Sequence, residues 1–193
     1  MRTRSFLALA LLGGLGLVPA HAGLIPSVVT ATPDGANFRF TYAVVLPSDY
    51  RLKSGDFFTI YDFQGYVGGG TNAQPANWTF GIGTTGPNPP HISAPDNPGV
   101  VNLTWSYNGP TLVGQQGLGN FSALSQFQNR TDGFFASRDY SQAEGHVVGN
   151  ITTTDVPGRS GDIQQTPEPA TVALLAAALP ALGLLRLLRT RNR

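Results

Sequence analysis

The sequence predicts an all-β fold, with a single β-sandwich ectodomain at residues 23–155 built from about seven or eight short strands. Residues 38–46 and 101–107 alternate between apolar and polar side chains, which is the period of a strand with one buried face. Clusters of Gly, Pro, Asn and Asp separate the apolar stretches. No long segment before the C-terminal tail has helical spacing. A jelly roll is one arrangement that this number of strands allows.

Residues 1–22 have the three parts of a secretory signal peptide. Two arginines precede an apolar stretch at residues 6–18, and the small residues Ala20 and Ala22 mark a cleavage site. We therefore expect the exported chain to begin at Gly23. An uncleaved membrane helix fits less well, because the apolar stretch is short for a membrane span.

The remaining elements of the body follow in order. Residues 57–63 are apolar on both faces, as expected for a central strand covered on both sides. Further strands are expected at residues 25–32, 78–82, 120–127, 134–140 and 146–154. The five prolines within residues 83–99 predict a long surface loop, which is either functional or a mobile excursion. Residues 156–165 are rich in Gly and polar side chains and predict a linker to the tail.

Charge and composition limit the functions open to the body. Residues 23–165 carry five arginines and one lysine against ten carboxylates, a net charge of −4. This part of the chain lacks the basic footprint of a nucleic-acid-binding protein, so we expect no nucleic-acid partner. The chain has no cysteine, which excludes disulfides and a thiol nucleophile.

No motif in the body has the sequence context that a catalytic or cofactor-binding site requires. Residues 81–86 spell G-x-G-x-x-G, but prolines follow and forbid the helix that a dinucleotide site requires. His91 and His146 lie far apart in the sequence and form no zinc-binding motif. A Ser–His–Asp set assembled only in space needs no sequence proximity and stays open as a minor alternative. We expect no catalytic residue, no metal and no cofactor.

The carboxylates of the body have a structural and a catalytic interpretation. Asp56 and Asp62 bracket an expected strand, and Asp132, Asp139 and Glu144 lie near one another in sequence. Paired carboxylates hydrolyse glycosides only when they are about 5–9.5 Å apart in a cleft. Aspartates at strand ends more often cap turns, and calcium between loops has no EF-hand motif to support it.

Aromatic residues supply the best candidates for ligand contact. Tyr66 and Trp78 carry large rings with a polar group, in a chain rich in Asn, Thr, Ser and Gly. Such rings can stack on sugars at the surface of a sandwich. The competing interpretation, a place in the core, is stronger for Trp78 because it falls on the apolar phase of its strand, whereas Tyr66 lies beside glycines.

The C-terminal segment 166–193 has an order of its own. Pro167, Glu168 and Pro169 open it, an uncharged Ala- and Leu-rich run follows, and four arginines close it: Arg186, Arg189, Arg191 and Arg193. As a helix, the uncharged run rises about 25 Å, slightly less than the ~30 Å hydrocarbon core. With the leucines beyond Arg186, it predicts a transmembrane helix at residues 170–188, whose basic end stays on the cytoplasmic side.

This order resembles the PEP-CTERM sorting signal of bacteria that secrete exopolysaccharide. In that family an exosortase, a membrane enzyme, recognises the tail and cleaves near the Pro-Glu-Pro motif. The resemblance implies that Pro167, Glu168 and Pro169 are the recognition residues and that the helix is a temporary membrane anchor. It covers the tail alone and implies nothing about the body.

Three hypotheses of function follow. The first is a non-enzymatic surface or matrix protein, exported by its signal peptide, held in the membrane and processed by an exosortase. It would then lie at the cell surface or outside the cell, with exopolysaccharide as a partner. The second is a carbohydrate-binding or adhesive module, in which Tyr66 or Trp78 contacts the glycan. The third is an exported hydrolase with a dispersed active site.

Overall fold

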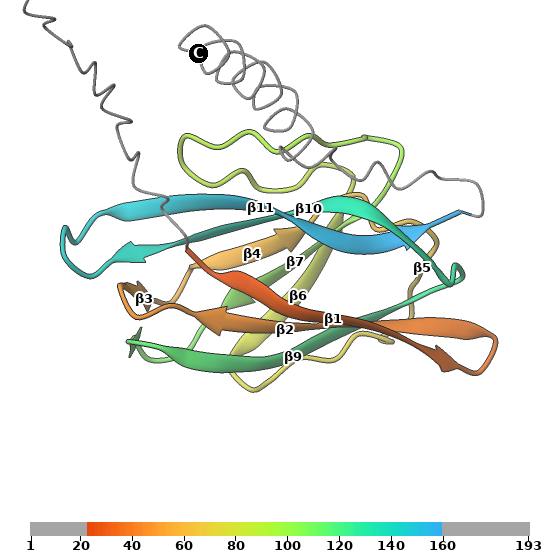
Figure 1. Cartoon of the computed structure of the whole chain (residues 1–193), viewed down its shortest axis with the longest axis horizontal. Helices are drawn as coiled ribbons and strands as arrows, with labels where there is room; N and C mark the ends of the chain where they lie inside the picture. The colour runs from red at the N-terminus through yellow and green to blue at the C-terminus, as the bar shows by residue number, and fades with distance from the viewer. Residues whose placement is uncertain (1–22, 160–193) are drawn as a thin grey trace, which may run out of the picture.

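The computed structural model describes residues 23–159, and this part of the chain is all-β and without helices (Figure 1). Its strands form two antiparallel sheets that face each other. The four-stranded sheet has the order β1 (Ile25–Asp34), β2 (Asn37–Leu46), β9 (Gln116–Ser125) and β5 (Tyr66–Val67). The seven-stranded sheet has the order β6 (Trp78–Gly83), β7 (Asn102–Tyr107), β4 (Phe57–Ile60), β10 (Asn129–Ser141), β3 (Tyr50–Leu52) and β8 (Leu112–Val113). The seventh strand, β11 (Val147–Gly158), pairs with the edge of β10 that faces away from β3 and β4. The predicted all-β, sandwich-like class is confirmed.

The apolar side chains that alternate along β2 are buried, as the sequence predicts. Phe40, Tyr42, Val44 and Leu46 are at most 1 % exposed, whereas the residues between them are partly exposed. β2 lies between β1 and β9, so its backbone is paired on both sides and its apolar face points into the core. The four-stranded sheet thus contributes one wall of the sandwich.

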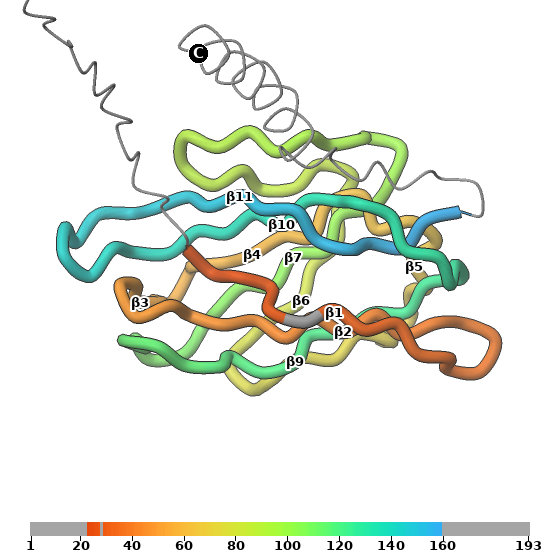
Figure 2. The backbone as a smooth tube through the Cα atoms, in the orientation of Figure 1, coloured from red at the N-terminus to blue at the C-terminus, as the bar shows by residue number. Residues whose placement is uncertain are grey.

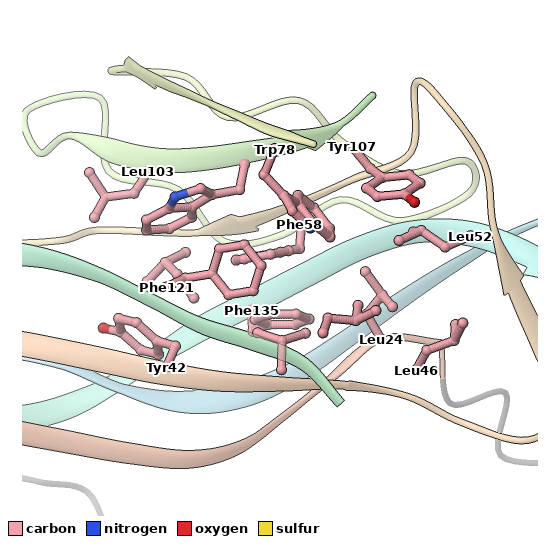
Figure 3. Close-up of a cluster of buried hydrophobic side chains, with 14 of the residues drawn as sticks. Leu24, Tyr42, Leu46, Leu52, Phe58, Trp78, Leu103, Tyr107, Phe121 and Phe135 are labelled. Atoms are coloured by element: carbon pink, nitrogen blue, oxygen red, sulfur yellow. The ribbon is translucent and has the colours of Figure 1, made fainter. Parts of the chain in front are cut away.

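Aromatic rings fill the space between the sheets, with Phe58 at their centre (Figure 3). The Phe58 ring stacks on Trp105 of β7 at 5.3 Å and on Phe135 of β10 at 5.1 Å, between ring centroids. It meets Phe121 of β9 edge-on at 4.8 Å, and Trp78 at 5.5 Å. Because Phe121 belongs to the opposite sheet, this cluster joins the two walls of the sandwich.

The boundaries of two strands differ from the prediction. β4 ends at Ile60, although Tyr61 and Phe63 beyond it are buried as expected. Asp62 has a φ of 56°, which ends the extended backbone. β11 runs to Gly158, so the start of the expected linker at residues 156–165 belongs to the sheet. Val156 is 1 % exposed and packs in the core, which explains why the strand continues there.

Three short strands, β3, β5 and β8, do not appear among the predicted elements. Each has two or three residues, which is too short for an alternating pattern to be recognised. β3 and β8 extend one end of the seven-stranded sheet, and β5 forms an edge of the other sheet. They are held by pairing with longer neighbours rather than by their own sequences.

The predicted proline-rich loop is confirmed between β6 and β7, and it covers the outer face of the seven-stranded sheet (Figure 2). The Tyr61 hydroxyl donates a 2.9 Å hydrogen bond to the Pro87 carbonyl. Asp96 accepts hydrogen bonds from the Gly86 N–H and the Asn102 amide, at 3.2 and 2.9 Å. The loop is thus tied to β4 and β7, and it buries Tyr61 completely.

The export elements of the sequence lie outside the described residues. This holds for the expected signal peptide at residues 1–22 and for the tail at 166–193 with its helix at 170–188. Between residues 23 and 159, no helix has the length and apolarity needed to cross a membrane.

Replacing Phe58 tests how much the aromatic cluster contributes to the free energy of unfolding. Phe58→Ala removes the stacking on both neighbouring strands and leaves a cavity, so the free energy of unfolding should fall by about 3–5 kcal/mol. Ile82→Ala, at a side chain 56 % exposed on the same sheet, should change it by less than about 0.5 kcal/mol. Urea unfolding followed by tryptophan fluorescence measures both. Equal losses in the two variants would contradict this description of the core.

Candidate functional site

One pocket lies next to Tyr66, where β5 and the ends of β11 and the proline-rich loop meet. It encloses about 210 Å³, and we refer to it as the Tyr66 pocket. It is lined by Phe63, Gln64, Gly65, Tyr66, Gly99, Val100, Val101 and Arg159. The volume is below that of a typical drug-sized ligand site and suits a single small group such as one sugar residue.

Tyr66 is held in this pocket by aromatic neighbours. Its ring lies 6.2 Å from the buried Phe63 and 6.1 Å from Phe80, between ring centroids. Gly65 precedes it at a φ of 63°, and a side chain there would collide with Phe127. The turn at Gly65 leads into β5. Tyr66, the first residue of β5, is partly buried and lines the pocket.

Arg159 supplies the positive charge at the pocket. It is exposed, follows the last residue of β11 and lies over the Phe127 ring at 5.7 Å. No sequence pattern singles out Arg159, because it falls within the expected linker at residues 156–165. A pocket lined by a tyrosine and an arginine can stack on a sugar ring and pair with an acidic substituent.

Trp78, the second predicted glycan contact, lies in the core instead. It is 7 % exposed and packs against Phe58, Tyr107 and Phe121 (Figure 3). A ring enclosed in this way has no free face on which a sugar could stack. The structure therefore places Tyr66 and Trp78 in different environments and removes Trp78 as a direct contact.

A pair of buried carboxylates, Asp56 and Asp139, forms the second notable site. Both residues are 0 % exposed. Asp56 accepts a 2.7 Å hydrogen bond from the Lys53 N–H, as expected for a turn cap, and its other oxygen lies 3.8 Å from the Arg138 Nε. Asp139, on the inward face of β10, accepts a 2.8 Å hydrogen bond from the Leu24 N–H. We call these two residues the acid pair.

Burial raises the pKa values of both members of the acid pair. The pKa of Asp56 rises to about 6, mainly through burial, with the Lys53 N–H and the charges of Arg138 and Lys53 acting in the opposite direction. The pKa of Asp139 rises to about 7 through burial and the nearby Asp56 carboxylate, opposed by the Leu24 N–H. Raised carboxyl pKa values are typical of general acids. Here, however, both groups are enclosed by protein, so a substrate bond cannot reach them.

The other residues considered for chemistry do not converge on either site. His91 is exposed on the proline-rich loop, and His146 is exposed at the turn between β10 and β11. The His146 Nδ1 lies 3.1 Å from a Glu144 oxygen, and both side chains are more than half exposed. Asp62 accepts a hydrogen bond from the Asn97 N–H at 2.9 Å, which joins the segment after β4 to the proline-rich loop. Among residues 23–159, no group of three or more His, Cys, Asp or Glu side chains is placed to hold a metal ion.

Comparison with known proteins adds no family. No protein-family model matches the chain, and no curated protein sequence matches it. The functional interpretation therefore depends on the residues of this chain.

The stability of the fold should depend on pH through Asp56. Between about pH 4 and 6 the folded state keeps a proton that the unfolded state has released, because the folded pKa of about 6 lies above the ordinary 3.8. The free energy of unfolding should therefore fall as the pH rises through this range, and the contribution of Asp56 should level off above it.

Asp56→Asn removes this contribution while keeping an acceptor for the Lys53 N–H, so the decline should become shallower. Asp132→Asn, at an exposed carboxyl group, should leave the slope unchanged. Urea unfolding at half-unit intervals from pH 4 to 7 measures all three chains. An undiminished slope in Asp56→Asn would contradict the assignment.

Proposed function

We propose that the protein is a non-enzymatic surface or matrix protein of an exopolysaccharide-producing bacterium. It is exported by its signal peptide, held by its C-terminal helix and processed by an exosortase near Pro167, Glu168 and Pro169. The observation that carries this proposal is the order of sequence elements: an export signal, a β body without a catalytic motif, and a Pro-Glu-Pro, apolar and arginine-rich tail.

The architecture of the body supports this proposal in two respects. β1 begins at Ile25, just after the expected cleavage site, so the sandwich can form from the exported chain alone. The core is closed by aromatic packing and needs no disulfide, which suits a chain that has no cysteine. The acid pair, whose carboxyl groups have raised pKa values, is buried out of reach of a substrate, so we do not favour the hydrolase hypothesis.

The processing step can be tested with a tag inserted in the turn at Gly35, whose added side chain would meet nothing within 4 Å. Replacing Pro167, Glu168 and Pro169 together by alanine should leave the tail attached and the protein in the membrane fraction. Replacing Gln164 and Gln165 by alanine is the matched control and should leave processing intact. Intact-mass measurement of cell and extracellular fractions follows both. Normal processing of the triple variant would refute the sorting proposal.

The Tyr66 pocket favours glycan binding as a second function of the same exported protein. Its tyrosine, its small volume and the charge of Arg159 together favour one residue of an acidic polysaccharide as the ligand. This function agrees with the first proposal, because a matrix protein must be retained by something in the matrix.

Tyr66→Ala should weaken binding to an acidic polysaccharide by about tenfold or more, because the stacking surface is lost. Tyr66→Phe should retain most of the binding if the ring matters more than the hydroxyl group. Tyr140→Ala, which removes a tyrosine at a distant site, is the control. Retardation in gels that contain the polysaccharide measures binding, with urea unfolding to show that each variant is folded. Equal retardation of all variants would exclude the pocket.

A further inference from the structure

The start of the body is buried against Asp139. Leu24 is 0 % exposed; its N–H donates to Asp139 Oδ2, and its carbonyl accepts a 3.1 Å hydrogen bond from the Asn150 amide. Gly23 is buried as well. A methyl group on its Cα would lie 2.4 Å from Asp139 Oδ2, which is too close for any side chain. Glycine at this position therefore permits the backbone to approach the carboxylate.

Asp139 is incompletely partnered. Its second oxygen, Oδ1, is buried and has no hydrogen-bond partner within the described part of the chain. The nearby charges do not neutralise it, because Arg138 pairs with Asp56 and Lys53 lies over the Tyr140 ring at 3.8 Å. A buried carboxylate without a cation or a full set of donors is costly. Asp139 can therefore accept one further hydrogen bond, and a positively charged donor would remove most of this cost.

The nitrogen of Gly23 lies close to this carboxylate, on the side of Oδ2. The amide nitrogen and a Cβ on the same Cα are about 2.5 Å apart, so this nitrogen lies within about 5 Å of Asp139 Oδ2. In an uncut chain it is a neutral amide with a single N–H. When the bond between Ala22 and Gly23 is hydrolysed, the same atom becomes an ammonium group with three donors and a positive charge. A rotation of the chain end would then bring it to the carboxylate.

We propose that removal of residues 1–22 turns Gly23 into the counter-ion of Asp139, so that export processing completes the fold. This inference rests on the proposed export of the protein. It also orders the events: Gly23 is buried in the folded body, so the bond before it is cut while the chain is still unfolded. The new terminus then lies next to Leu24, against Asp139.

The test compares two exported chains purified from the same bacterium. In the first, processing leaves Gly23 as the terminus. In the second, Ala-Ser is inserted between Ala22 and Gly23, so the ammonium group is moved away from Asp139. Mass spectrometry identifies both termini. Asp139→Asn is then introduced into each chain, with Asp132→Asn as the control, and urea unfolding is measured at pH 7.

We expect Asp139→Asn to lower the folding equilibrium constant at least about tenfold more in the Gly23 chain than in the extended chain. A second measurement needs no substitution. The α-amine of the Gly23 chain should react with an acylating reagent at pH 8 at least about tenfold more slowly than that of the extended chain, because it is buried and paired.

Equal effects of Asp139→Asn in both chains, together with equal amine reactivity, would overturn the inference and leave the export proposal standing. A terminus at another residue of the body would do the same. Recovery of the protein with residues 1–22 still attached would overturn both.

Discussion

The edge-on contact between Phe58 and Phe121 is the interaction that the rest of the structure depends on, because it packs together two sheets that no disulfide connects. Phe58 is opposite Trp105 in the register of β4 and β7, so pairing the strands also stacks the rings. A slip by one residue would move Phe58 to the outer face and place Thr59 in the core. Backbone pairing and ring packing thus select the same register.

The end of the sandwich that contains Leu24 is closed by leucines and buried polar side chains instead of aromatic rings. Beyond the aromatic rings, Leu24, Leu46 and Leu52 fill the space between the sheets (Figure 3). Leu24 precedes β1 and is not part of a strand, so its backbone groups need partners from elsewhere. Asp139 and Asn150 supply them, and this explains why polar side chains are buried at this end.

Sequence patterns located the strands that have one apolar face, as β2 shows, and the long loop, because prolines exclude it from a sheet. They named Asp139 among the carboxylates but did not predict its burial, because a polar residue on the inward face of β10 interrupts the pattern and its partners are distant in sequence. Leu24 is 115 residues away. Trp78 was ambiguous for a similar reason, since an aromatic residue at a strand end can point to either side until the opposite sheet is placed. The burial of Asp139 and of Trp78 depends on contacts between the two sheets, which the periodicity of a single strand does not predict.

The two ends of the body differ in a way that matches the two processing events we propose. Gly23 is buried and lies against a carboxylate, whereas Arg159 is exposed and borders a pocket. A protease can reach a bond beside a buried residue only before the fold closes, but it can reach a bond that follows an exposed segment at any time. In the processing that we propose, the cut before Gly23 therefore precedes the folding of the sandwich, because Gly23 is buried once the fold has formed.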